Sequence, residues 1–142
     1  MEEQIMNMPA VALRGLTILP GMIAHFDISR ERSLRAVEEA MEQDQKIYLV
    51  TQRNVDSEDP TQEDLYQMGI VADIKQVVRL QNDVVRILVD GISRAALLGF
   101  TGNEKYLEAE ICYCDSNADS LPDEYLFSFL QSEFYFDFLK YI

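Results

Sequence analysis

Apolar and polar residues alternate in short runs over much of this chain, a pattern that predicts β-strands. Val11 and Leu13 alternate with a small and a charged residue, and this period of two is typical of a half-buried strand. Pro20-Gly21 then predicts a tight turn, because proline favours the first corner of such turns and glycine adopts the positive φ that the second corner requires. Apolar residues resume at 23–28, so two strands joined through this turn are expected.

The apolar period changes to that of a helix after residue 28. Leu34, Val37 and Met41 recur at helical spacing, with Ala36 and Ala40 beside them, and form one apolar stripe, which predicts an amphipathic helix from Arg30 to Gln45. Ser29 stands just before this segment and is a residue type that commonly caps helices. The stripe is expected to pack against the strands, with the glutamates of the far side in solvent.

Strand-like runs return after the helix, at residues 46–51, 70–80, 84–89, 94–100 and 106–113. Asn82-Asp83 separates two of them and predicts a hairpin, because both residue types tolerate the left-handed conformation of tight turns. Thr61–Asp64 predicts a single capped helical turn in an otherwise polar connection. About six or seven strands with one helix predict an α+β, mainly β fold, a closed or nearly closed small barrel with the helix against one side.

Acidic residues dominate the charge of the chain and narrow the range of partners. The 142 residues carry a net charge of −13, and the acids are spread along the whole sequence. A field of this sign repels phosphate backbones and anionic lipid head groups, so neither nucleic acid nor a membrane surface is expected as a partner. It is compatible with weak attraction of basic or unfolded polypeptide segments. The length and apolar content suit one globular domain rather than a disordered chain.

The N-terminal residues and the cysteines bear on the compartment. The first residues lack the basic and apolar regions of a secretory signal, and no run approaches the length of a transmembrane helix. The two cysteines, Cys112 and Cys114, stand two apart in a strand-like run, where they share a face but are poorly placed to bond each other. These features predict a cytoplasmic protein.

Residues that could support catalysis or bind a metal are sparse. No glycine precedes a Lys-Ser or Lys-Thr pair, and no serine has the setting of an activated nucleophile. His25 is the single histidine and is expected to be partly buried in its strand. With Cys112 and Cys114 it supplies at most three zinc ligands where structural sites take four, and the acidic clusters lack the turn glycine of calcium loops. No catalytic residue, metal or cofactor is therefore expected.

Several blocks of the sequence are informative when they are taken together. They are residues 9–33, 52–53, 58–61, 63–66, 69–72 and 89–95. In order and spacing these blocks closely resemble the N-terminal LON substrate-binding domain of the bacterial Lon ATP-dependent proteases. The resemblance spans residues 9–113, which makes it far more specific than any single short motif. It implies a β-rich, PUA-like pseudo-barrel, in agreement with the fold predicted from the strand pattern.

The resemblance implies a domain that is not catalytic by itself. Lon enzymes carry a P-loop ATPase and a Ser/Lys peptidase dyad, and neither motif lies in this sequence. The implied role is substrate recognition and assembly in a protease that degrades misfolded and short-lived regulatory proteins. The implied partners are unfolded or degron-bearing proteins, the ATPase domain of the same enzyme and further copies of the chain. The alternative is a free-standing LON-domain adaptor that binds a protein partner or a small ligand.

The turn between the first two predicted strands carries the candidate binding residues, which are Leu19, Pro20, Met22 and Ile23. Flexible apolar side chains at the tip of a turn can grip varied hydrophobic stretches of unfolded substrate, and methionine adapts well to different partners. The alternative is that these side chains fold back onto the barrel and complete its core.

The last part of the chain differs in character from the rest. This difference divides the sequence into a β-rich domain at 1–115 and the start of a helical segment at 116–142. Lon proteins usually continue into a charged amphipathic helical segment, whereas aromatic residues lie on all sides of this one. Such residues are expected to pack in a self-association interface, for which the candidates are Phe127, Phe129, Phe134, Phe136 and Phe138.

Overall fold

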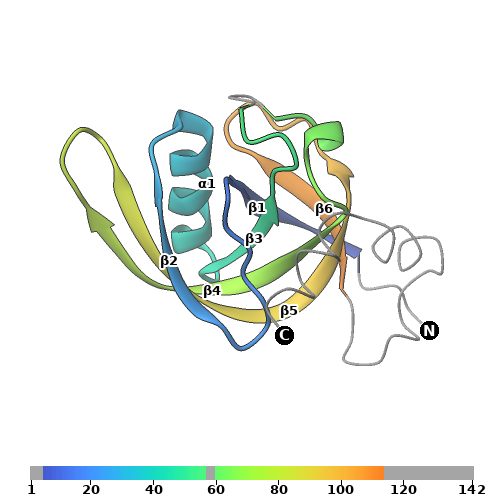
Figure 1. Cartoon of the computed structure of the whole chain (residues 1–142), viewed down its shortest axis with the longest axis horizontal. Helices are drawn as coiled ribbons and strands as arrows, with labels where there is room; N and C mark the ends of the chain where they lie inside the picture. Colours follow the sequence, from blue (N-terminus) through green and yellow to red (C-terminus); the bar gives the residue numbers. More distant parts are fainter. Residues whose placement is uncertain (1–4, 57–59, 114–142) are drawn as a thin grey trace.

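The alternating segments form strands that coil around one helix (Figure 1). The computed structural model describes residues 5–56 and 60–113, and within them it contains six strands, one α-helix and one 3₁₀ turn. In chain order the elements are β1 (Ile5–Leu13), β2 (Ile23–Ile28), α1 (Glu31–Glu42), β3 (Lys46–Thr51), η1 (Gln62–Asp64), β4 (Met68–Arg79), β5 (Val85–Phe100) and β6 (Glu108–Tyr113).

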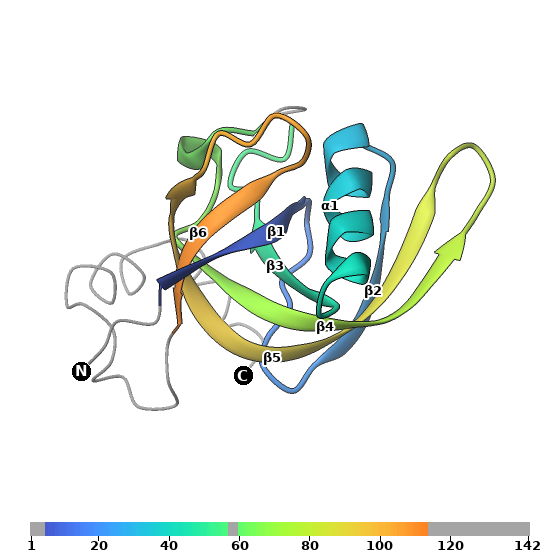
Figure 2. The ribbon, with the colours of Figure 1, turned by 180° about the vertical axis from the view of Figure 1, so that it is seen from behind.

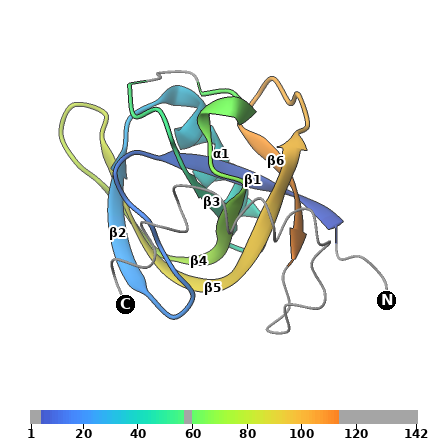
Figure 3. The ribbon, with the colours of Figure 1, turned by 45° about the vertical axis from the view of Figure 1, so that its right-hand side comes forward.

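The sheet closes on itself through its longest strand. Its order is β2-β5-β4-β3-β1-β6, and β5 pairs a second time with β6, so five of these strands form a ring. The edge of β5 that faces away from β4 pairs with β2 along residues 85–90 and with β6 along residues 95–100. β1 and β3 are parallel, and the connection between them carries β2 and α1 (Figure 3). The predicted barrel with a helix against one side is confirmed.

Two hydrophobic cores lie on opposite faces of β1 and β3. The first packs one face of these strands against α1 and the first half of β5, with Val11, Leu49 and Ile87 among its members. The second fills the space on the other face, where Tyr48 and Ile111 are fully buried. Both faces of the two central strands are therefore removed from water. Figure 2 shows the barrel from behind, with α1 beside β1 and β3.

β1 is more deeply buried than its alternation predicts. The expected half-buried strand would expose one face, yet Ala10 and Ala12 on that face are 0% and 8% exposed. Val11 and Leu13 belong to the core beneath α1, whereas these alanines belong to the second core. The prediction of one exposed face was wrong because alanine is compatible with either an exposed or a buried position. Here it fits a strand that is covered on both sides.

The helix is shorter than predicted, and its apolar stripe faces the strands except at Met41. It spans Glu31–Glu42, and its N-cap residue is Arg30, with no side-chain hydrogen bond, rather than Ser29. Met41, expected in the apolar stripe, is 38% exposed, and the buried face is made of Ser33, Ala36, Val37 and Ala40. Four of the five predicted apolar positions are thus buried or half-buried, and Ser33 joins them at the start of the helix.

β5 is continuous where two strands were predicted. It runs from Val85 to Phe100 without interruption, because a β-bulge absorbs the irregularity near Gly91. On β4, Val71 and Ala72 are consecutive, but their partners on β5 are Ser93 and Gly91, which leaves Ile92 as the extra residue. The bulge bends the strand so that its two halves serve different cores.

The predicted turns are present between these strands. Asn82 and Asp83 both adopt positive φ, at 62° and 60°, and connect β4 to β5 in a hairpin that projects beyond the barrel (Figure 1). Thr61 opens η1 with a capping box, in which its backbone N–H donates to Asp64 Oδ2 at 3.0 Å. Both turns confirm the local sequence signals.

Some expectations fall on residues that the structure does not describe. The five candidate phenylalanines between positions 127 and 138 lie outside the described residues, as does the predicted boundary between 115 and 116. Within residues 5–56 and 60–113, the one α-helix is too short and too polar to cross a bilayer.

Candidate functional site

The candidate binding residues form a well-defined β-turn between β1 and β2. The Met22 N–H donates to the Leu19 carbonyl at 3.0 Å, which closes the turn around Pro20 and Gly21. Gly21 has a φ of +81°, so the turn has the features of type II, with proline and glycine at the two corners. The sequence prediction of a Pro-Gly turn is correct in position.

Two backbone hydrogen bonds, one to the carbonyl and one from the N–H of Gly91, join this turn to β5. The Gly21 N–H donates to the Gly91 carbonyl at 2.8 Å, and the Gly91 N–H donates to the Met22 carbonyl at 2.8 Å. A Cβ atom at position 91 would lie 2.3 Å from the Leu19 carbonyl oxygen and 2.8 Å from Ile70 Cδ1. The turn can therefore approach β5 this closely because position 91 has no side chain.

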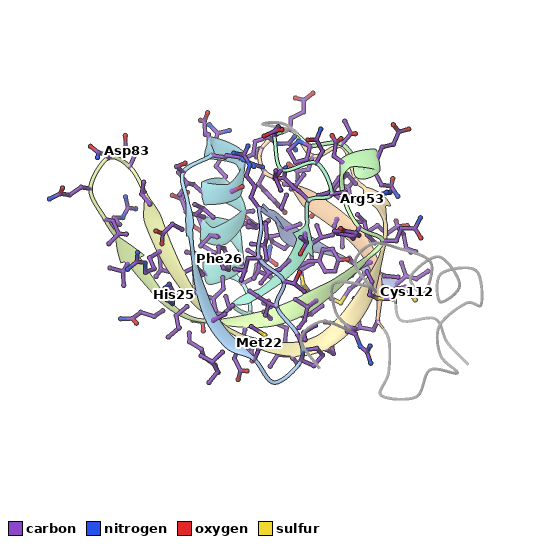
Figure 4. The ribbon with its side chains drawn as sticks, in the orientation of Figure 1. Met22, His25, Phe26, Arg53, Asp83 and Cys112 are labelled. Carbon is purple, nitrogen blue, oxygen red and sulfur yellow. The ribbon has the colours of Figure 1, made fainter. Side chains whose placement is uncertain are left out.

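The side chains at this turn are exposed to different extents. Ile23 is 70% and Met22 is 37% exposed, and Ile92 in the bulge of the neighbouring strand is 44% exposed. Pro20 is exposed as well, whereas Leu19 is half-buried. Figure 4 shows Met22 at the start of β2, where the chain passes close to β5. We call the group Leu19, Pro20, Met22, Ile23 and Ile92 the apolar tip.

Charged side chains border the apolar tip on the sheet. Ile23 pairs with Asp90 across β2 and β5, and Asp90 pairs in turn with Asp73 on β4. Lys46 Nζ donates to Asp73 Oδ1 at 2.9 Å, and this bond raises the pKa of the lysine above its ordinary value. Asp90 has no such bond among the described residues. The apolar tip therefore has an acidic side, which suits a segment that combines apolar and basic residues.

His25 is more exposed than predicted. It is exposed on β2 opposite Leu88, whereas its neighbour Phe26 points toward α1 and is buried in the core there (Figure 4). The expected partial burial is wrong, because the alternation of β2 places residue 25 on the outer face.

The residues considered for zinc are not brought together in the described part of the chain. Cys112 is buried on β6, His25 is exposed on β2, and Cys114 lies outside the described residues. No group of three or more potential metal ligands occurs within residues 5–56 and 60–113. The acidic residues of α1 are spread along its outer surface, and Glu31 pairs with Arg35 there.

The sequence does not reveal the roles of Ile92, which belongs to the apolar tip, and of Gly91, which supports it. Ile92 and Gly91 lie in the block 89–95, but the sequence reads there as the end of one strand and the approach to another. The available signal is the glycine inside a strand-like run, which commonly marks a bulge or a close backbone approach. The segment that Gly91 approaches is the turn before β2. Gly21 in that turn bonds to Gly91 but lies seventy positions earlier in the chain, so no local pattern reveals the contact.

The architecture defines a class of small β-barrel domains with one helix across the sheet. The N-terminal domain of the Mycobacterium avium complex Lon protease superposes with a TM-score of 0.64 at 18% identity, over 96% of this chain and 74% of that one. The Lon N-terminal domain protein from Xanthomonas campestris gives a TM-score of 0.60 at 14% identity, over 78% of this chain and 60% of that one.

Sequence comparison identifies the family. The model of the ATP-dependent protease La (LON) substrate-binding domain matches residues 7–134, and the chain belongs to this family. The Lon protease of Lachnoclostridium phytofermentans is 41% identical over 111 residues, which are 78% of this chain and 14% of that protein. The Lon protease of Clostridioides difficile is 36% identical over 131 residues, which are 90% of this chain and 17% of that protein.

These matches also show which part of a Lon protease the chain resembles. The chain spans about a seventh of the length of the Lon protease of Lachnoclostridium phytofermentans. The matching family model is that of the substrate-binding domain, which is not the catalytic part of the protease. The expectation of a domain that is not catalytic by itself is confirmed.

Proposed function

We propose that this domain recognises unfolded or degron-bearing polypeptides for a Lon-type protease through its apolar tip. The observation that supports this proposal is the combination of exposure and rigidity at the turn. Met22, Ile23 and Ile92 expose apolar surface to solvent, although the backbone that carries them is hydrogen-bonded to β5. Apolar groups held in place before binding lose little conformational freedom when a segment covers them.

The acidic side of the apolar tip adds a preference to this apolar grip. Asp90 lies beside Ile23 in the sheet, and the whole chain carries a charge of −13. A substrate segment with apolar residues next to lysine or arginine would therefore be held more firmly than an apolar segment rich in acids. The Met22 side chain can adjust to segments of different shape.

The role in a whole protease extends this proposal beyond the domain. By analogy with the Lon proteases that the chain matches over a small share of their length, the domain would pass misfolded and short-lived regulatory proteins to the ATPase of the same enzyme. This role would be carried out in the cytoplasm and within a homo-oligomer. The aromatic residues between positions 127 and 138 stay the predicted self-association surface.

A double substitution tests the apolar tip. Met22→Ser with Ile23→Ser removes two apolar side chains of the tip, one in the turn and one at the start of β2. Met22 is 37% and Ile23 is 70% exposed, so the double change does not open the core. Reduced and alkylated lysozyme, a basic polypeptide that cannot refold, is the ligand, and its affinity is measured by fluorescence anisotropy. We expect binding to weaken about five- to thirtyfold, since two apolar contacts contribute roughly 1–2 kcal/mol.

The matched control carries the same kind of change at another surface. Met41 and Val55 are 38% and 49% exposed, and neither belongs to the apolar tip. Met41→Ser with Val55→Ser should leave the affinity unchanged, and circular dichroism should show both double variants folded. Equal weakening by the two double variants, or none by the first, would remove the apolar tip from the proposal.

A further inference from the structure

A cavity of about 230 Å³ lies at the N-terminal end of α1, apart from the apolar tip. Its walls come from the end of β1, the end of β2 and the residues that lead into the helix. The apolar part of the wall includes Leu16 and Phe26, and the polar part includes Arg14, Ser29, Arg30 and Ser33. Two arginines and two serines thus line one small cavity in a strongly acidic protein.

The first turn of α1 borders this cavity through Arg30 and Ser33. The first bond of the helix joins the Leu34 N–H to the Arg30 carbonyl at 2.9 Å, so the N–H groups of residues 31–33 have no acceptor within the helix. The N-cap residue Arg30 supplies no capping oxygen from its side chain. Unpaired N–H groups and the helix dipole together favour a negative charge at this end.

Ser33 provides an observation that does not depend on the helix end. It is only 5% exposed, and the described residues offer its hydroxyl no hydrogen bond. No fully buried side-chain oxygen or nitrogen lacks a partner in the described part of the chain. The hydroxyl must therefore retain some access, and the cavity that Ser33 lines provides it. A nearly buried donor that faces a cavity without a protein partner indicates a site for a polar ligand.

The charges around the cavity favour an anion over a cation. Arg30 is oriented by a bond from its Nη2 to Gln52 Oε1 at 2.7 Å, and Arg14, which follows β1, also lines the cavity. Asp27 is the one carboxylate among the lining residues, and Arg86 already donates to its two oxygens at 2.8 and 3.1 Å. Glu31 belongs to the same helix turn but is paired with Arg35.

We propose that this cavity binds a small oxyanion, held by the hydroxyl and the N–H of Ser33 and by the guanidinium groups of Arg14 and Arg30. The anion would be a phosphate group or a carboxylate, because both present acceptor oxygens to converging donors. Its apolar wall at Leu16 and Phe26 accommodates the carbon chain of a larger ligand that carries the anion. This site is independent of the apolar tip and of the proposed substrate binding.

Inorganic phosphate is the first probe. It is titrated into the isotope-labelled 142-residue chain at constant ionic strength, and backbone amide signals are followed by NMR. We expect saturable shifts at the amides of residues 31–33, with half-saturation in the millimolar range. Ser33→Ala should weaken binding about fivefold and Arg14→Gln about tenfold, since bonds to charged groups are stronger than bonds between neutral groups.

The control separates the cavity from the overall charge. Arg94 is exposed on β5 and does not line the cavity, so Arg94→Gln removes the same charge elsewhere and should leave phosphate binding unchanged. Ser33→Ala keeps the helix, because alanine is the best helix former. The proposal is overturned by amide shifts that do not saturate, or by equal weakening from Arg94→Gln and Arg14→Gln.

Acetate at the same ionic strength identifies the source of the anion. If acetate saturates the same amides at similar concentrations, the site takes a carboxylate such as a chain terminus. If phosphate binds and acetate does not, the site takes a phosphate group. Both results support the cavity as an anion site, whereas failure of both anions to bind overturns it.

Discussion

Two turns of this domain expose apolar side chains, and they are supported in opposite ways. The turn that begins at Leu19 is hydrogen-bonded to both the N–H and the carbonyl of Gly91 on β5. The β4–β5 hairpin turns at Asn82 and Asp83 and projects beyond the barrel, with Leu80 near its end 38% exposed (Figure 1). Similar apolar surface is thus carried once on an anchored turn and once on a projecting one.

The difference shows how the barrel makes a binding surface rigid. Near the end of the projecting hairpin the backbone contacts are its own, from the Leu80 N–H to the Val84 carbonyl at 2.8 Å and from the Val84 N–H to the Gln81 carbonyl at 3.4 Å. The anchored turn is instead held by hydrogen bonds to β5, a strand that contributes side chains to both cores. An anchored apolar surface loses less entropy on binding, which is why we place the binding site there.

The largest effect is expected from the glycine that anchors the first turn. Gly91→Ala would place a Cβ atom 2.3 Å from the Leu19 carbonyl oxygen, so the turn or the strand must move. We expect a loss of about 3 kcal/mol in the free energy of unfolding, measured by urea denaturation. Because the turn would be displaced, binding of unfolded lysozyme should weaken as well.

A second glycine of the same strand is the control. At Gly99 the nearest atom to an added Cβ would be Gln62 Oε1, the end of a flexible side chain, at 3.6 Å. Gly99→Ala should therefore remain within about 1 kcal/mol of the parent chain. Similar losses for the two variants would mean that the anchor at position 91 is not what holds the turn.

The sequence predicts the elements whose causes are local. Pro20-Gly21 and Asn82-Asp83 mark their turns correctly, because the φ values that tight turns require are met by these residue types. The spacing of Leu34 and Val37 is sufficient to predict the helix. The closed barrel follows from the number of short strands and from the family resemblance.

The features that the sequence does not reveal depend on distant partners. β5 is one strand because its bulge at Ile92 is defined by the register with β4, which no local pattern specifies. Met41 is exposed, although it continues the spacing of Leu34 and Val37, because the strands cover only the face of α1 that carries Ala36, Val37 and Ala40. The anchoring role of Gly91 likewise requires knowledge of what lies opposite, and the candidate site was therefore only partly predictable.

A smaller effect is expected at the projecting hairpin. Asp83 has a φ of 60°, a conformation that costs most residues energy but suits glycine. Asp83→Gly should stabilise the domain by about 0.5 kcal/mol, and Asp83→Ala should destabilise it by about 1 kcal/mol, both measured by thermal unfolding. The binding of unfolded lysozyme should be unaffected by either change. A loss of binding would show that the projecting hairpin belongs to the binding surface.

The smallest effect concerns the ion pair that joins the two regions. Asp27 on β2, which follows the anchored turn, accepts bonds from Arg86 near the base of the hairpin at 2.8 and 3.1 Å. The bond with Arg86 lowers the pKa of Asp27 below its ordinary value. The stabilisation is therefore fully present above the ordinary pKa of an aspartate and is lost as the pH falls through the lowered value.

Asp27→Asn removes this pH-dependent contribution and measures its size. The urea midpoint of the parent chain should exceed that of the variant at neutral pH, and the difference should shrink once the pH is low enough to protonate Asp27. Asp56→Asn is the control, because Asp56 is exposed and makes no ion pair with the other described residues. The difference should be slight, since both partners are accessible to water and surface ion pairs contribute little. A difference between the two urea midpoints that persists unchanged at low pH would mean that asparagine alters the packing of β2. The ion pair would then not be the link between the anchored turn and the hairpin.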